Sequence, residues 1–64
     1  MPLIDVSLLS GRDAAQKRKL IEALTQATVD ALGSDPKAVT VILRDVERTD
    51  WASAGVPLAD KKPG

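Results

Sequence analysis

The chain has 64 residues, with nine basic and nine acidic side chains and therefore no formal net charge. It contains neither cysteine nor histidine, which excludes disulfides, thiol chemistry and nearly every zinc site. The balanced charge gives no basic face for nucleic acid, and no apolar run approaches the ~20 residues of a membrane span. The amino-terminal residues lack the pattern of a signal peptide, so we expect a cytoplasmic protein.

The small size of the chain predicts a single domain that is marginally stable alone, because such chains bury only ~60% of the surface they expose when unfolded. The apolar fraction of 44% is typical of a globular protein, but it includes one aromatic residue, Trp51. The core must therefore be aliphatic. With disulfides and most metal sites excluded, oligomerisation remains as the source of additional stability.

A first strand is predicted over residues 2–9, where apolar side chains alternate with others. One face would carry Ile4, Val6 and Leu8. A proline suits the first position of a strand because it donates no hydrogen bond to a neighbouring strand. A turn over residues 10–12 should end this strand.

An amphipathic helix is predicted over residues 14–32, with Asp13 as its N-cap and Gln16 at the capping-box spacing. Gly33 is the expected stop. The buried side should carry apolar residues at helical spacing, namely Leu20, Leu24, Ala27 and Ala31. The solvated side should carry three consecutive cations, Lys17, Arg18 and Lys19.

A second strand is predicted over residues 38–46, which are rich in β-branched side chains. A strand, a helix and a strand in this order predict a crossover connection between parallel strands. Two strands and one helix leave open edges and an uncovered face. We therefore predict an α+β fold: a β-α-β subunit with two parallel strands and one crossover helix, whose sheet is completed by oligomerisation.

The remaining residues, 47–64, are polar and rich in turn-forming types. A short hairpin is possible around residues 52–58. Trp51 lies in this polar context and should dock against another part of the assembly. Residues 60–64 are predicted to form a loose tail.

Pro2 is the candidate catalytic residue, because removal of an initiator Met1 would turn its nitrogen from an amide into a secondary amine. Proline in the second position normally favours this removal. An amine can act as a general base near neutral pH if a low-dielectric pocket lowers its pKa. The alternative is that Pro2 serves only as the first residue of a strand. If Met1 is kept, the Pro2 nitrogen stays an amide and cannot act as a base.

Several features together resemble the 4-oxalocrotonate tautomerase family, from residue 2 to about residue 55. They are Pro2 directly after Met1, Gly11-Arg12 after the first strand, Gln16-Lys17 at the helix start, the β-rich second strand, and Trp51 where the family usually has phenylalanine. The resemblance implies dimers that usually build hexamers. It also implies proton transfer in enols and 2-oxo acids without any cofactor. Residues 1–64 would then be one tautomerase-like β-α-β domain with a polar C-terminal tail.

The resemblance implies a role for each site residue. Pro2 would be the general base, Arg12 would bind the carboxylate of a small-molecule substrate, and Trp51 would wall the pocket. An extended strand separates Pro2 from Arg12 by roughly 33 Å, so they cannot meet within one subunit. Only an oligomer, expected to be a homohexamer or a dimer, could bring them together.

One departure from the family concerns the substrate. The family's characterised diacid tautomerases carry a second arginine where this chain has Thr40. Arg44 should lie on the same strand face but ~13 Å further along, so it is not a simple replacement. A different substrate, a weaker activity, or a heteromeric partner that supplies an arginine all remain open.

Alternative roles exist for three of these residues. Arg12 could be a solvated turn residue or a partner of Asp13, and Trp51 could be only an interface anchor. Arg44 could form an ion pair with Asp45 or Glu47 of a neighbouring chain, which is the interpretation the pattern favours.

Two rival functions follow from the same residues. The chain could be a non-catalytic oligomeric module, or a hydratase-like dehalogenase or decarboxylase on the same scaffold. The latter enzymes need a carboxylate that activates water near the proline. Asp50 is the one candidate for that carboxylate.

Overall fold

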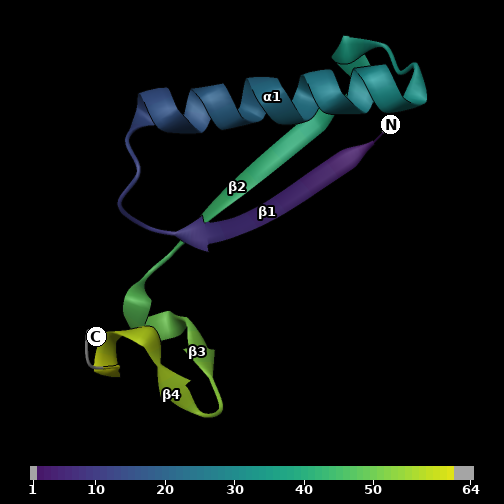
Figure 1. The fold of residues 1–64 in the computed structure, drawn as a ribbon. Helices are drawn as coiled ribbons and strands as arrows, with labels where there is room; N and C mark the ends of the chain where they lie inside the picture. Colours follow the sequence, from purple (N-terminus) through teal and green to yellow (C-terminus); the bar gives the residue numbers. More distant parts are fainter. Residues whose placement is uncertain (1, 62–64) are drawn as a thin grey trace.

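The computed structural model describes residues 2–61 of the chain. Two longer strands and one helix form the body, followed by a small hairpin (Figure 1). The elements in chain order are β1 (Leu3–Leu9), α1 (Ala14–Leu32), β2 (Thr40–Val46), β3 (Ala52–Ser53) and β4 (Val56–Pro57). Three short 3₁₀ helices connect them, at Pro36–Ala38, Arg48–Asp50 and Leu58–Asp60. Within residues 2–61, no helix is long and apolar enough to cross a membrane.

Strands β1 and β2 pair in parallel, which confirms the predicted β-α-β fold. Their register runs from Leu3 opposite Thr40 to Leu9 opposite Val46. The prediction placed the start of β2 two residues too early, because residues 36–38 form a 3₁₀ helix. The carboxylate of Asp35 caps this helix by accepting the backbone N–H of residue 37 at 3.0 Å.

Helix α1 has the predicted bounds, and the predicted capping residues are found at both of its ends. The backbone N–H of Gln16 donates to the Asp13 carboxylate at 2.8 Å, and the Gln16 side chain accepts the Asp13 N–H at 3.1 Å. Gly33 adopts the left-handed conformation with φ of 67° and donates to the Val29 carbonyl at 2.9 Å. The capping box and the glycine stop therefore satisfy backbone groups that the helix alone would leave unpaired.

The side chains of α1 that the sheet covers differ in part from those predicted. Leu20 and Leu24 are half-buried as expected, but Ala27 and Ala31 are exposed. The narrow two-stranded sheet covers one line of side chains on the helix, which includes Thr28, a residue expected alongside the apolar line, but not Ala27. Much of the apolar side of α1 therefore still faces solvent in the single chain.

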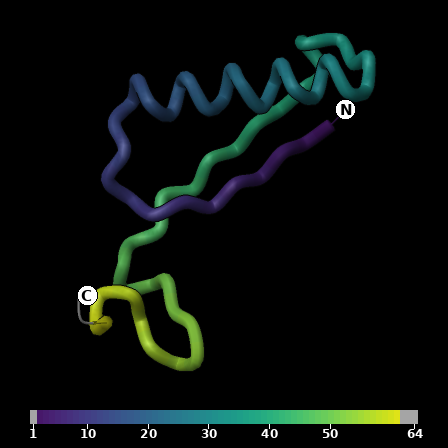
Figure 2. The backbone as a smooth tube through the Cα atoms, viewed as in Figure 1, coloured from purple at the N-terminus to yellow at the C-terminus, as the bar shows by residue number. Residues whose placement is uncertain are grey.

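The two faces of the β1–β2 sheet differ sharply in exposure, and α1 lies on one side of the sheet (Figure 2). The covered face carries alternating residues that are half-buried: Ile4, Val6, Leu8, Val41 and Leu43. The open face carries the intervening residues, which are all exposed: Leu3, Asp5, Ser7, Thr40, Ile42 and Arg44. This alternation confirms the predicted assignment of Ile4, Val6 and Leu8 to one face.

The β3–β4 hairpin was predicted, and it lies apart from the β-α-β body (Figure 1). Its two-residue turn has positive φ at both Ala54 (51°) and Gly55 (78°), the geometry that matches the twist of a tight hairpin. The prediction of a loose tail from residue 60 is wrong at its start. Asp60 belongs to a 3₁₀ helix that ends with a hydrogen bond from Lys61 N–H to the Leu58 carbonyl. Residues 62–64 lie outside the described part.

The chain is extended for its size. Its radius of gyration is 15.1 Å, whereas a compact domain of this length has about 11 Å. Its solvent-accessible surface is 4925 Å², which exceeds by roughly a quarter the surface expected for a compact monomer of its mass. Both quantities show that the single chain exposes more surface than a compact monomer of its size.

Candidate functional site

Pro2 lies immediately before β1, beside the first residue of β2. It is half-buried, and its carbonyl oxygen accepts the backbone N–H of Thr40 at 3.0 Å. This hydrogen bond continues the β1–β2 ladder by one residue and fixes the position of Pro2. The structure therefore brings Pro2 and Thr40 together, two of the residues that the sequence singled out.

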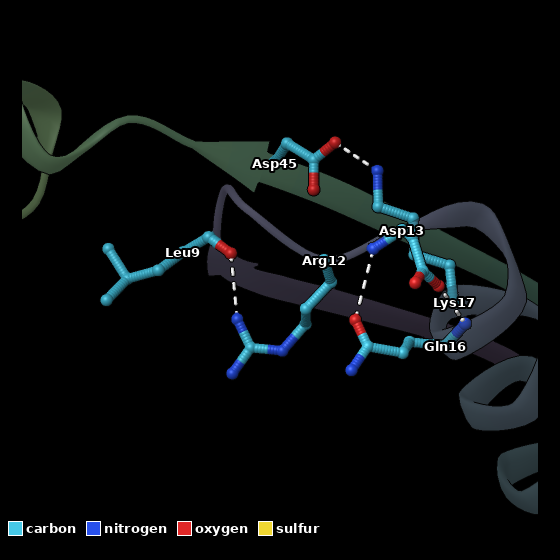
Figure 3. Close-up of polar contacts among 6 residues, drawn as sticks. All are labelled: Leu9, Arg12, Asp13, Gln16, Lys17 and Asp45. Carbon is cyan, nitrogen blue, oxygen red and sulfur yellow. Dashed lines mark hydrogen bonds and ion pairs between the residues drawn. The ribbon is translucent and has the colours of Figure 1, made fainter.

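Arg12 lies beyond the opposite end of β1. Its Nη1 donates a hydrogen bond to the Leu9 carbonyl at 2.9 Å (Figure 3). The predicted alternative of a pair with Asp13 is wrong, because the Asp13 carboxylate caps the helix instead. Among residues 2–61 no carboxylate pairs with Arg12. The guanidinium has five N–H donors, so it can still bind a carboxylate while one donor holds it to the strand end.

Lys17 was predicted to lie on the solvated side of the helix, and the structure corrects this. Its ammonium group pairs with the Asp45 carboxylate near the end of β2 (Figure 3). The side chain of Lys17 is half-buried. This pair ties the first turn of α1 to β2, and so it restrains the turn that carries Arg12.

Arg44 was predicted to pair with Asp45 or Glu47 of another chain, but it pairs with Asp5 of its own chain. Its Nε and Nη2 donate to the two carboxylate oxygens at 2.9 and 3.0 Å, a bidentate arrangement. The register explains the pair, since Arg44 lies opposite Ser7 and thus diagonal to Asp5 on the open face. The hydrogen bonds from Arg44 lower the pKa of the Asp5 carboxyl, and the same contacts raise the pKa of Arg44.

Sequence reasoning assigned Asp5 no role. Alternation along each strand separately placed Asp5 on one face of β1 and Arg44 on one face of β2, without relating the two faces. What the sequence could not provide is the parallel register, which decides that the two side chains reach each other.

Trp51 lies between a 3₁₀ helix and β3, in the part of the chain that is remote from β1 (Figure 1). The residue is partly exposed, at 38%. Its backbone carbonyl accepts the Leu58 N–H at 2.7 Å, which closes the hairpin region. Asp50 is also exposed, and its N–H donates to the Glu47 carbonyl at 2.9 Å. Within one chain, neither Trp51 nor Asp50 lies near Pro2.

The single chain therefore distributes the candidate site over three places. Pro2 and Thr40 lie at one end of the sheet, Arg12 lies past the other end of β1, and Trp51 lies in the hairpin region. Residues 2–61 contain no group of acidic side chains arranged to hold a metal ion. A site that uses Pro2, Arg12 and Trp51 together has to be assembled from more than one chain.

Comparison with known proteins shows which class this fold belongs to. The sequence profile of the tautomerase family, described as "Tautomerase enzyme", matches residues 2–61. A probable tautomerase of Ralstonia nicotianae is 45% identical over 62 residues, covering 97% of this chain and 89% of the relative. The 2-hydroxymuconate tautomerase of Comamonas testosteroni is 39% identical over 56 residues, covering 88% of this chain and 89% of that protein.

Solved structures agree with the sequence relatives. A 4-oxalocrotonate tautomerase homologue superposes with a TM-score of 0.87 at 40% identity, covering 98% of this chain and all of the other. A heterohexameric 4-oxalocrotonate tautomerase from Chloroflexus aurantiacus gives a TM-score of 0.90 at 31% identity, covering 97% and 100% of the two chains. The chain therefore belongs to the tautomerase family and is a tautomerase-like isomerase, which confirms the resemblance seen in the sequence.

Proposed function

We propose that this protein is a cofactor-free tautomerase that moves a proton within an enol or 2-oxo acid, with Pro2 as the general base. The observation that carries the proposal is the family match over residues 2–61, which begins at this proline. Relatives named 2-hydroxymuconate tautomerase support the substrate class. The balanced charge and the cysteine-free composition fit an enzyme of the cytoplasm.

The chemistry requires that Met1 be removed, so that Pro2 carries a free secondary amine. The neutral amine accepts the hydroxyl proton of the enol. The enol electrons form a carbonyl, and a carbon of the same molecule takes the proton back from the Pro2 ammonium. The base is regenerated without any other reactant. The amine works best when its pKa lies near the operating pH, and a closed, poorly hydrated pocket lowers the pKa in that direction.

A homo-oligomer, either a hexamer or a dimer, would complete the site. In it, Arg12 of one chain binds the substrate carboxylate beside Pro2 of another, and Trp51 walls the pocket and excludes water. The separation of these residues in one chain supports this arrangement. Because the Chloroflexus aurantiacus neighbour is a heterohexamer, a mixed assembly is the alternative.

The expected substrate carries one carboxylate. Thr40, the residue nearest Pro2 along β2, has no charge. Arg44 shares its face but is held by Asp5 in a bidentate ion pair. Arg12 is then the site residue that offers a cation, so mono-acid enols are the first substrates to screen, with the diacid 2-hydroxymuconate as the comparison.

The first experiment measures the intact mass of the protein purified from cells, together with turnover of these enols. The expected result is a mass without methionine and measurable proton transfer. Pro2→Ala should then lower kcat/KM by about 10²–10⁴-fold, the usual contribution of a general base, with the assembly retained. Pro36→Ala serves as the matched control, because it replaces a proline in a 3₁₀ helix and should leave kcat/KM near wild type. An active protein that keeps Met1, or full activity in Pro2→Ala, would overturn the assignment of Pro2.

A further inference from the structure

The turn between β1 and α1 carries Arg12, and hydrogen bonds hold this turn on both sides. Before Arg12, the Ser10 N–H donates to the Val46 carbonyl at 2.9 Å, which extends the β1–β2 ladder past the end of β1. After Arg12, the Asp13 carboxylate accepts the Gln16 N–H at 2.8 Å and so fixes the start of α1. The backbone of Arg12 therefore runs between two restrained points, one on the sheet and one on the helix.

The Lys17–Asp45 ion pair joins these two points. The Lys17 ammonium pairs with the Asp45 carboxylate, which lies one residue before Val46 in β2 and 28 positions from Lys17 in the chain (Figure 3). The Lys17 backbone N–H also donates to the Asp13 carbonyl at 3.1 Å. A path of bonds thus leads from β2 through Lys17 to the residue that follows Arg12. Any shift of the start of α1 relative to β2 has to stretch this ion pair.

The ion pair uses one of the three consecutive cations at the start of α1. Lys17 is half-buried, whereas Arg18 and Lys19 are exposed and pair with no carboxylate among residues 2–61. The side chains of the pair are 30% and 40% exposed, so water screens them and the pair adds little to the stability of the chain. We expect its effect on geometry instead, because a displacement of about 1 Å in a group that positions a substrate can lower the rate by ~10²-fold.

The direction of the Arg12 guanidinium depends on this geometry. Its Nη1 donates to the Leu9 carbonyl at 2.9 Å, and the side chain points toward Leu9 in Figure 3. The remaining N–H donors of the planar fork are oriented by this bond and by the position of the turn. A fork that is held in place before the substrate arrives loses less conformational entropy when it binds a carboxylate.

We propose that Lys17 and Asp45 are positioning residues, which hold the β1–α1 turn so that Arg12 presents its guanidinium to the substrate carboxylate. The inference rests on the role of Arg12 in the proposed function but not on Pro2 as the base. Neither residue of the pair touches the substrate; both act through Arg12. Loss of the pair should therefore weaken binding of the carboxylate and leave the proton-transfer step nearly unchanged.

A comparison of two substrates tests this inference. The enol of phenylpyruvate carries one carboxylate, and its methyl ester is the matched substrate without that charge. Lys17→Met removes the ammonium but keeps an unbranched side chain, and Asp45→Asn removes the other charge of the pair. Each variant should raise the KM of the acid by about 3- to 10-fold and change its kcat by less than about twofold, since only binding is weakened. The kinetics of the ester should stay near those of the variants' parent.

A double variant shows whether the pair acts through Arg12. Arg12→Ala alone should abolish the preference for the acid over the ester. Adding Lys17→Met to Arg12→Ala should raise the KM of the acid no further, because the group that the pair positions is already gone. Lys17→Arg keeps a cation at the same place and should restore the preference for the acid.

Two controls separate positioning from folding and from general charge. Lys19→Met removes one charge from the exposed side of the same helix and should leave both substrates unaffected. Circular dichroism and sedimentation report whether each variant keeps its helix and its assembly. If Lys17→Met does not fold, the test proceeds with Asp45→Asn, whose side chain has nearly the same shape as the native one.

A binding measurement makes the test independent of the base. In Pro2→Ala, calorimetry with phenylpyruvate in its 2-oxo form gives a dissociation constant without turnover, and adding Lys17→Met should raise it by about 3- to 10-fold. Turnover that survives in Pro2→Ala would overturn the assignment of Pro2 but leave this comparison valid. The two proposals therefore fail separately.

Specific results would overturn the inference. An unchanged KM of the acid in both Lys17→Met and Asp45→Asn would show that the pair does not position Arg12. Equal losses with the acid and the ester would show a structural defect instead. A further loss on the Arg12→Ala background would show that the pair acts by another route. A wild-type protein with no preference for the acid would show that Arg12 binds no carboxylate.

Discussion

The two faces of the β1–β2 sheet show how this subunit divides its sequence between folding and assembly. The covered face carries mainly aliphatic residues, such as Val6 and Leu43, and α1 packs on it. The open face interleaves Leu3 and Ile42 with polar residues and one ion pair. A single helix is enough to half-bury the first face but leaves the second exposed. Among the described residues, this chain therefore has no fully buried core, and the proposed homo-oligomer would cover the exposed face.

The largest effect should come from the covered face. Leu43→Ala removes apolar contact between β2 and α1 and is expected to lower the free energy of unfolding by about 2–3 kcal/mol. Ile42→Ala, one residue away on the open face, should instead act mainly on association, by about 1–2 kcal/mol. Urea unfolding followed by circular dichroism measures the first effect, and sedimentation on dilution measures the second. Equal effects of both substitutions on both measurements would contradict the division between the faces.

A smaller effect is expected from the helix that covers the sheet. Asp13→Ala removes the N-cap, leaves a backbone N–H of α1 without its partner, and should lower the free energy of unfolding by about 1 kcal/mol. Asp30→Ala, further along the same helix, should change it by less than about half as much. Urea unfolding of the two variants at one protein concentration makes the comparison. A larger loss in Asp30→Ala would show that the capping box does not stabilise the covering layer.

The smallest effect in the free chain is the pH dependence of the open face. Arg44 lowers the pKa of Asp5 below its ordinary value of 3.8, so the pair is fully formed above that pH and its contribution is lost as the pH falls through the lowered pKa. The free energy of unfolding should therefore fall slightly on acidification below about pH 4, and Asp5→Asn should show less of this dependence. Urea unfolding from about pH 3 to pH 6 tests the expectation. Identical profiles for wild type and Asp5→Asn would exclude Asp5 as the group that titrates.

Local chemistry was sufficient to predict most of the elements. The bounds of α1 followed from the capping box at Asp13 and the glycine at position 33, which act within a few residues of the helix ends. The hairpin over residues 52–57 followed from turn-forming residues. The early start given to β2 shows where local pattern fails, because Ala38 suits either a strand or the 3₁₀ helix that it joins. The local signal that could have decided it is Asp35 followed by Pro36, a cap and a first helical residue.

Residue types and short spacings were enough to predict the fold class, the candidate base at Pro2 and the need for other chains. The partners of the charged residues depended instead on how the chain folds in space. The pairing of Arg44 with Asp5, of Lys17 with Asp45, and of Arg12 with the Leu9 carbonyl depends on register and on the path of the turn. Residues 39 positions apart become neighbours only when two strands align, and a pattern read along one strand contains no information about that alignment.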